Sequence, residues 1–191
     1  MTQGQMPAPN PIQLKITLVD SEPEVWRQVV VPAAVTLADL HGIIQDAMGW
    51  QRLHDHSFQI GLGNKRSLLA EEKLLSAVLT KAGDSPEERL RQRSLYYNYD
   101  AENGWQHRLV AEPLTAMETA DEKVAAARLP VCLAGEAACP PEGSGGIWGY
   151  DQFMAQLEDV EDPDYITLLD QYGDFDPNAF DLAAANARLL R

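Results

Sequence analysis

The sequence has few basic residues, few cysteines and no long apolar run. Of its 191 residues, 15 are Lys or Arg and 29 are Asp or Glu, which gives a net charge of −14. Residues 101–191 carry most of the imbalance, with 5 basic and 17 acidic residues. A surface of this charge repels the phosphates of a nucleic acid. We therefore expect no nucleic-acid partner, and we interpret the short basic run at Arg89, Arg91 and Arg93 as a solvated surface.

The small number of cysteines and the short apolar segments bear on the compartment. Only Cys132 and Cys139 are present, which is too few for a disulfide framework in a chain of this size. No apolar window approaches a membrane-spanning length, and residues 1–11 lack the basic and apolar segments of a secretory signal. We expect a soluble, cytoplasmic protein without a membrane partner, in which residues 1–11 form a flexible tail.

Alternating apolar residues predict strands in the first 110 residues. A capping box at Thr36 and Asp39 begins a helical pattern that ends at Gly49. The order is a hairpin, a helix, a return strand, an insertion expected to be helical or irregular, and a second hairpin. The predicted segments are residues 12–18, 25–31, 37–48, 56–60, the insertion at 64–94, 95–99 and 105–109.

Helical periodicity takes over from Tyr150 onward. Two Asp-Pro pairs have the form of a helix N-cap followed by proline at the first helical position. The expected helices begin at Tyr150, at Asp162 (ending near Gly173) and at Leu182. Because the strands precede the helices, the predicted class is α+β. We expect a β-grasp-like mixed sheet in a domain at residues 12–149, and an acidic helical appendage at residues 150–191 packed on the same domain.

Residues 130–150 are unusually rich in proline, glycine, cysteine and large aromatics. Local propensity predicts a loop here, so tertiary contacts, a ligand or a metal must fix its shape. We expect the loop from Cys132 to Gly149 to close over a binding pocket for an unidentified protein or small ligand. The residues expected to line that pocket are His54, His56, Asp100, Trp105, His107, Trp148 and Tyr150.

The histidines and cysteines also allow a metal site. His54 and His56 point the same way if they share a strand, and His107 lies on another predicted strand. With Cys132 and Cys139 they offer the nitrogen and sulfur ligands that zinc or another divalent metal takes. The six residues between the cysteines exceed the usual ligand spacing, so structural histidines and buried thiols are the competing interpretation.

Several short motifs are combined in this chain in a distinctive way. They are LKITL, VWRQVVVP, TLADLHGIIQDAMGW, HDHSF, YD with a later WQH, and CLAGEAACPPE followed by GG and GY. From Ile12 to Leu189 the chain resembles the plasmid pRiA4b ORF-3-like family, whose members are also described as insertion-sequence passenger or TnpR-like proteins. The resemblance implies an association with mobile elements and no assigned biochemical role.

The chain departs from the family pattern at two places. Relatives typically have YDFGDDWEH where this chain has YDAENGWQH from Tyr99 to His107, and Ser144 stands where many relatives have a third cysteine. Both departures weaken a carboxylate-dependent or cysteine-rich metal chemistry. A serine recombinase needs a basic DNA-binding surface, which the acidic C-terminal half does not offer, so that activity is rejected.

The residues therefore favour a non-enzymatic binding or protein-interaction module. The alternative is a metal-assisted hydrolase in which His54, His56 and His107 hold the metal and Asp100 acts as the base.

Overall fold

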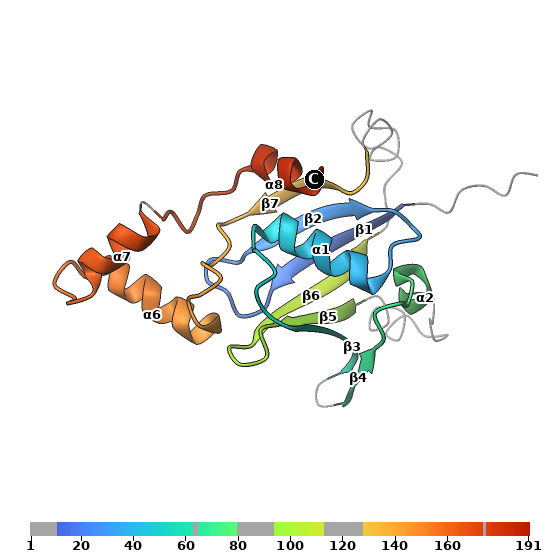
Figure 1. Ribbon diagram of the computed structural model, residues 1–191, viewed down its shortest axis with the longest axis horizontal. Coiled ribbons are helices and arrows are strands. Elements are labelled where there is room, and N and C mark those ends of the chain that lie inside the picture. The colour runs from blue at the N-terminus through green and yellow to red at the C-terminus, as the bar shows by residue number, and fades with distance from the viewer. Residues whose placement is uncertain (1–10, 63–64, 80–93, 113–127, 174) are drawn as a thin grey trace, which may run out of the picture.

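The predicted strands belong to a single sheet (Figure 1), and most of their apolar residues are buried. The computed structural model describes residues 11–62, 65–79, 94–112, 128–173 and 175–191. In these residues seven strands pair in the order β4-β3-β5-β6-β1-β2-β7. They are β1 (Ile12–Leu18), β2 (Trp26–Val31), β3 (His56–Leu62), β4 (Lys65–Leu69), β5 (Ser94–Tyr99), β6 (Trp105–Glu112) and β7 (Val131–Glu136).

The predicted α+β class is confirmed, with a correction to the sheet. Every pairing of the described strands is antiparallel, so the sheet is not mixed. Parallel neighbours need a crossover connection, and here neighbouring strands are joined by hairpins or meet as antiparallel partners across the sheet. None of the described helices is long and apolar enough to span a bilayer.

The two hairpins and the long helix lie where the sequence predicts them. In the first hairpin Ile12 is paired with Val31, and in the second Tyr99 is paired with Trp105. Helix α1 (Leu37–Met48) begins at Thr36, whose hydroxyl accepts a hydrogen bond from the Asp39 N–H at 3.1 Å. The helix ends at Gly49, which adopts the left-handed conformation with φ 91°.

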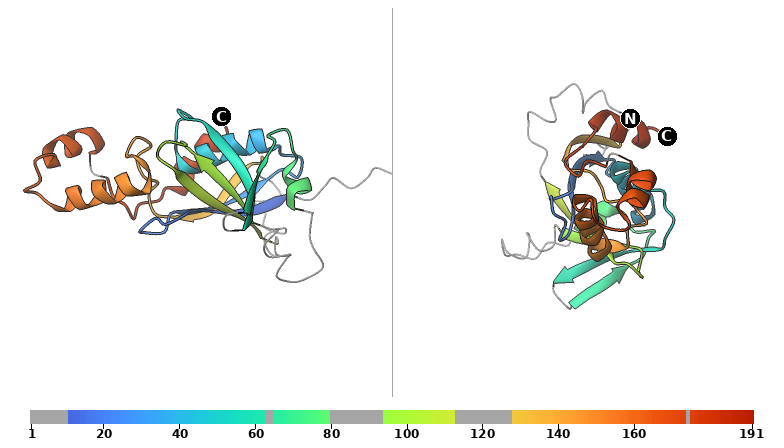
Figure 2. Two further views of the ribbon diagram at one scale, coloured as in Figure 1. Left: turned by 90° about the horizontal axis from the view of Figure 1, so that it is seen from below. Right: turned by 90° about the vertical axis from the view of Figure 1, so that its left-hand side faces the viewer.

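The core lies between α1 and one face of the sheet (Figure 2). Leu14 and Ile16 of β1 belong to this core together with Leu40 and Ile44 of α1, and all four side chains are fully buried. Burial of a side chain of this size contributes about 1.5 to 3 kcal/mol. Lys15, between the two β1 residues, lies on the solvated face, as expected of an antiparallel sheet with one covered face.

The expected insertion at residues 64–94 is partly a strand. β3 continues through Gly61, and β4 pairs with it in an antiparallel hairpin before the short helix α2 (Leu75–Leu79). Residues Lys65 to Leu69 do not alternate clearly between apolar and polar side chains. β4 is an edge strand, so its structure depends on pairing with its single neighbour, β3. Residues 80–93, which include the basic run Arg89, Arg91 and Arg93, lie outside the described residues, as do residues 1–10 of the expected tail.

The proline-rich and glycine-rich segment is also not a loop throughout. Its first part forms β7, which pairs with the edge of β2 so that Cys132 is opposite Val29. The free edge of β2 supplies backbone hydrogen-bond partners, which local propensity does not take into account. This is why the sequence predicted a loop where β7 forms. The remaining irregular part runs from Ala137 to Gly145.

Three helices complete the chain: α6 (Gly146–Glu158), α7 (Tyr165–Tyr172) and α8 (Leu182–Leu189). Helix α7 begins two residues later than predicted, with Asp164 in place of Asp162 as the N-cap, because the Asp162 carboxylate accepts the Asp164 N–H in a local turn at 2.8 Å. It ends at Gly173 as expected. Helix α8 packs against α1 and β7, whereas α6 and α7 pack on each other and extend away from the end of the sheet (Figures 1 and 2).

Candidate functional site

The connector, defined as residues 130–150, is fixed to the loop that follows α1. The Glu142 carboxylate accepts hydrogen bonds from the backbone N–H groups of Gln51, at 2.8 Å, and Leu53, at 3.3 Å. It accepts a further hydrogen bond from the Tyr99 hydroxyl of β5. Burial and this hydrogen bond raise the pKa of Tyr99 to about 12. One carboxylate therefore joins three segments that are far apart in the sequence, and protein contacts fix the shape of the connector.

Trp50 is the second anchor of the connector. Its indole N–H donates to the Pro140 carbonyl at 2.9 Å. The ring packs on Tyr99 and Trp105, with centroids 5.3 and 5.4 Å away, and edge-on against His107 at 5.3 Å. Trp105 and His107 are both fully buried, and neither lines any of the three hollows described below. Their row on β6 faces the aromatic core.

The side chain of His107 lies in apolar surroundings. Burial lowers its pKa to about 3, and only a contact with the Tyr97 backbone acts in the opposite direction. Neither ring nitrogen has a hydrogen-bond partner of normal geometry among the described residues. The imidazole therefore stays neutral in the core at working pH.

His56 does not join His54, because it stacks on a histidine of α1. The rings of His41 and His56 are 3.6 Å apart and nearly parallel, at 8°. Nδ1 of His41 lies 2.7 Å from the Tyr97 hydroxyl, and Nε2 of His56 lies 3.3 Å from the Glu71 carboxylate. Burial, reinforced by the neighbouring His56 and Arg52, lowers the pKa of His41 to about 4. The pair therefore packs α1 against β3.

The turn between β5 and β6 is held against the start of α6. The Asn103 side chain donates to the Asp100 carboxylate at 2.7 Å, and Asp100 itself has φ 56°. Gly146 lies directly on this turn, with φ 74°. A Cβ atom at Gly146 would be 2.1 Å from the Asn103 carbonyl oxygen, so only glycine fits.

These contacts leave a cavity of about 540 Å³ at the end of the sheet. We call it the acidic hollow, because the residues that line it include Asp55, Asp100 and Glu102. Nε2 of His54 lies 3.7 Å from the Asp100 carboxylate. The full lining is Arg52, Leu53, His54, Asp55, Asp100, Ala101 and Glu102. Of the seven predicted pocket residues, His54 and Asp100 are the two that the structure brings together here.

Asp100 is a buried carboxylate that stays ionised. Its residue is 3% exposed. Burial acts to raise the pKa of Asp100, but the Asn103 hydrogen bonds and the charge of the nearby His54 outweigh burial and leave the pKa below its usual value. A carboxylate in this state is a fixed negative charge at neutral pH, with reduced solvent screening.

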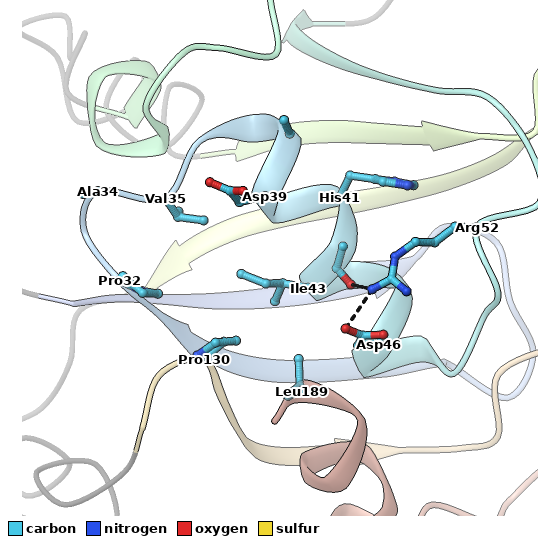
Figure 3. Close-up of a pocket in the computed structure, with 12 residues that line it drawn as sticks. Pro32, Ala34, Val35, Asp39, His41, Ile43, Asp46, Arg52, Pro130 and Leu189 are labelled. Carbon is cyan, nitrogen blue, oxygen red and sulfur yellow. Dashed lines mark hydrogen bonds and ion pairs between the residues drawn. The ribbon is translucent and has the colours of Figure 1, made fainter. Parts of the chain in front are cut away.

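Arg52 borders the acidic hollow but directs its charge elsewhere. Its guanidinium lies 2.8 Å from the Asp46 carboxylate and donates to the Gly42 carbonyl at 3.1 Å. Figure 3 shows Arg52 reaching toward Asp46 on α1. Arg52 also has φ 61°, a left-handed backbone that is rare for an arginine. The Arg52 guanidinium is thus already paired outside the hollow.

Two further hollows flank this region. One of about 460 Å³ lies between the loop after α1, the connector and α7, with Trp50, Pro140 and Tyr172 in its wall. The other, of about 600 Å³, is a groove along α1 that is closed by Pro130 and Leu189 (Figure 3). The connector therefore borders a hollow, although that hollow does not contain the predicted histidines.

The remaining predicted residues lie apart. Trp148 is 83% exposed, whereas Tyr150 is fully buried among the aromatics of α6. Cys132 sits in β7, where its thiol donates to the Ala134 carbonyl at 3.4 Å. Burial raises the pKa of both thiols, to about 12 for Cys139.

The described residues contain no group of three or more His, Cys, Asp or Glu side chains arranged to hold a metal ion. The set His54, His56, His107, Cys132 and Cys139 is accordingly not assembled as a ligand sphere: one histidine is in the core, one is stacked on α1, and one faces the acidic hollow.

Sequence reasoning missed three residues that build this region: Trp50, Arg52 and Glu142. The only signal for Trp50 and Glu142 was their presence in the motifs GW and CPPE, because their hydrogen-bond partners come from distant segments and are mostly backbone groups. Arg52 carried no signal, since its left-handed backbone and its pairing with Asp46 arise only in the folded chain.

The fold and the hollow define a class of α+β protein: an antiparallel sheet with one helix across it, closed at one end by a tyrosine-anchored connector. The chain belongs to the plasmid pRiA4b ORF-3-like family, whose model matches residues 10–184. The resemblance seen in the sequence motifs is thereby confirmed.

Two relatives cover most of the chain. An uncharacterised protein, y4hQ, of Sinorhizobium fredii (strain NBRC 101917 / NGR234) is 33% identical over an alignment of 192 positions, which covers 92% of this chain and 86% of that protein. The crystal structure of a protein of unknown function, MM3350, from Methanosarcina mazei Go1 has a TM-score of 0.72 and 30% sequence identity. The match covers 91% of this chain and 96% of that one.

Proposed function

We propose that this chain is a non-enzymatic binding module whose acidic hollow receives a cationic side chain of a partner protein. The observation that carries the proposal is the buried, ionised carboxylate of Asp100 in the wall of an open cavity. Asp55 and Glu102 are two further acidic residues in the lining of the same hollow. A Lys or Arg side chain has the charge and the reach to pair with them.

The wall of the hollow is held in place before a ligand arrives. Tyr99, which precedes Asp100, donates a hydrogen bond from its hydroxyl to Glu142. The Asp100 N–H donates to the Asp55 carbonyl at 2.9 Å. Asn103 holds the Asp100 carboxylate from the other side. Such preorganisation reduces the ordering cost of binding and supports recognition of a defined group.

Calorimetric titration with three capped tripeptides tests this proposal. The probes are acetyl-Ala-Lys-Ala-amide, acetyl-Ala-Arg-Ala-amide and acetyl-Ala-Glu-Ala-amide. We expect the two cationic peptides to bind and the anionic one not to bind. Asp100→Asn should weaken binding by about tenfold, which corresponds to about 1.4 kcal/mol. The matched control is Asp170→Asn, on the exposed surface of α7, which should bind as the parent does.

Absence of binding by the cationic peptides would overturn the proposal. So would equal binding of all three peptides, or an Asp100→Asn variant that is folded and binds as the parent does. Folding of each variant is checked by its thermal midpoint, because Asp100 also orders the turn through Asn103.

A further inference from the structure

The far end of the α6–α7 arm carries a dense acidic and apolar surface. We define the arm tip as residues 158–166, which join the two helices (Figures 1 and 2). Two large apolar side chains are exposed there, Val160 at 71% and Ile166 at 66%. The five carboxylates of the arm tip are Glu158, Asp159, Glu161, Asp162 and Asp164.

Within the part of the chain that the structure describes, no basic side chain pairs with this surface. No Lys, Arg or His occurs between Arg128 and Arg188. The ion pairs found among the described residues all lie in the sheet domain, and none includes a carboxylate of the arm tip. The negative charge of the arm tip is therefore open to an outside partner.

The exposed apolar residues are not needed to hold the arm together. The arm is held by aromatic contacts: Phe153 of α6 lies 5.0 Å from Tyr172 of α7 and 5.4 Å from Phe175, which follows α7. Helix α7 has no fully buried residue. Val160 and Ile166 thus lie outside the packed part of the arm, and exposed apolar residues rimmed by charge are typical of an interaction surface.

The arrangement fits a protein surface better than an ion or a second copy. The carboxylates of the arm tip form no group that could hold a metal ion, within the part of the chain that the structure describes. A second copy would bring another chain of net charge −14 to the same acidic surface. A basic partner complements the charge, and an apolar side chain on it would cover Val160 and Ile166.

We infer that the arm tip docks onto a basic protein segment that also presents apolar side chains. The segment has the chemistry of an amphipathic basic helix: Lys or Arg pairs with the carboxylates, and a Leu-like side chain packs on Val160 and Ile166. This surface is separate from the acidic hollow, so the inference goes beyond the proposed function and can fail independently of it.

Fluorescence anisotropy with labelled 18-residue peptides tests the inference on the full chain. One peptide is an amphipathic helix of Lys and Leu, the second has Glu in place of every Lys, and the third has Ala in place of every Leu. We expect the Lys-Leu peptide to bind, the Glu peptide not to bind, and the Lys-Ala peptide to bind at least fivefold more weakly. The affinity should fall as salt is raised.

Two tip variants and matched controls locate the binding. The variant with both Glu158→Gln and Glu161→Gln should bind the Lys-Leu peptide about tenfold more weakly than the parent. The variant with both Val160→Ser and Ile166→Ser should bind it about fivefold more weakly. The controls are Glu72→Gln, an exposed carboxylate, and Leu68→Ser, an exposed apolar residue of β4. Both controls, and Asp100→Asn, should bind as the parent does.

Three results would overturn the inference. The first is equal binding of the tip variants and the parent, with thermal midpoints unchanged. The second is binding that depends on Asp100 instead of the arm tip. The third is a dimer of the chain alone in sedimentation that the Val160→Ser and Ile166→Ser variant dissociates, since the occupant would then be a second copy.

Discussion

The Tyr99 hydroxyl donates a hydrogen bond to the Glu142 carboxylate, which lies 43 residues further along the chain. The same carboxylate accepts two backbone N–H groups, so its removal leaves three donors without their partner. We expect Glu142→Ala to lower the free energy of unfolding by about 1 to 3 kcal/mol. Urea denaturation measures this, with the exposed Glu72→Ala as control. A Glu142→Ala variant as stable as that control would show that the connector is not anchored here.

Gly146 is required where the β5–β6 turn meets α6. A methyl group there would lie 2.1 Å from the Asn103 carbonyl oxygen, in a residue whose φ is 74°. We expect Gly146→Ala to lower the free energy of unfolding by about 2 to 5 kcal/mol, because alanine disfavours the left-handed backbone and its methyl group overlaps the carbonyl oxygen. Gly143→Ala is the matched control, because no atom lies within 4 Å of its added methyl group. Equal thermal midpoints for the two variants would contradict the close contact.

Acid should destabilise the protein through His107. The unfolded chain takes up a proton on this residue below about pH 6.5, whereas burial lowers the pKa in the folded chain to about 3. The stability due to the neutral ring is thus present above pH 6.5 and is lost as the pH falls toward 3. His41, with a pKa of about 4, acts in the same direction.

The variant His107→Leu should therefore show a smaller loss of stability between pH 6.5 and 4. At pH 7 we expect its free energy of unfolding to be within about 1.5 kcal/mol of the parent, because Leu replaces a neutral buried ring of similar size. Urea denaturation at several pH values measures both effects. A pH dependence identical to that of the parent would show that His107 can be protonated in the folded chain.

Both cysteines should react slowly with alkylating agents in the folded protein. Burial raises the pKa of Cys132 and of Cys139, the latter to about 12, so almost no thiolate is present at pH 8. Iodoacetamide labelling followed by mass spectrometry should find little modification without urea and two modified thiols in urea. Rapid labelling of Cys139 in the folded protein would show that its thiol is accessible and ionised.

The sequence predicted those elements whose signal is local. The helix at residues 37–48 could be predicted because its cap and its glycine stop lie within the same segment, and the hairpins follow from alternation. The strands β4 and β7 could not be predicted, since each is an edge strand that depends on backbone partners from a distant neighbour. The late start of α7 depends on the Asp162 turn, which competes with helical capping.

The candidate site was predicted in part, for a similar reason. Alternation places Trp105 and His107 on the same face of β6, but it does not show whether that face lines a cavity or the core. The pairing of His54 with Asp100 lies within the predicted set, whereas Glu142 is bound by two backbone N–H groups and by the distant Tyr99 hydroxyl, which no motif reveals. The same limit explains why five possible metal ligands looked convergent in the sequence and are separate in the structure.

The most direct test of the acidic hollow is the NMR signal of the His54 ring during titration with acetyl-Ala-Arg-Ala-amide. His54 lies in the wall of the hollow, 3.7 Å from Asp100, whereas His41 lines the groove along α1. We predict a saturable shift of the His54 signal that is lost in Asp100→Asn, with the His41 signal unchanged. A shift confined to His41, or none at any peptide concentration, would contradict binding in the hollow.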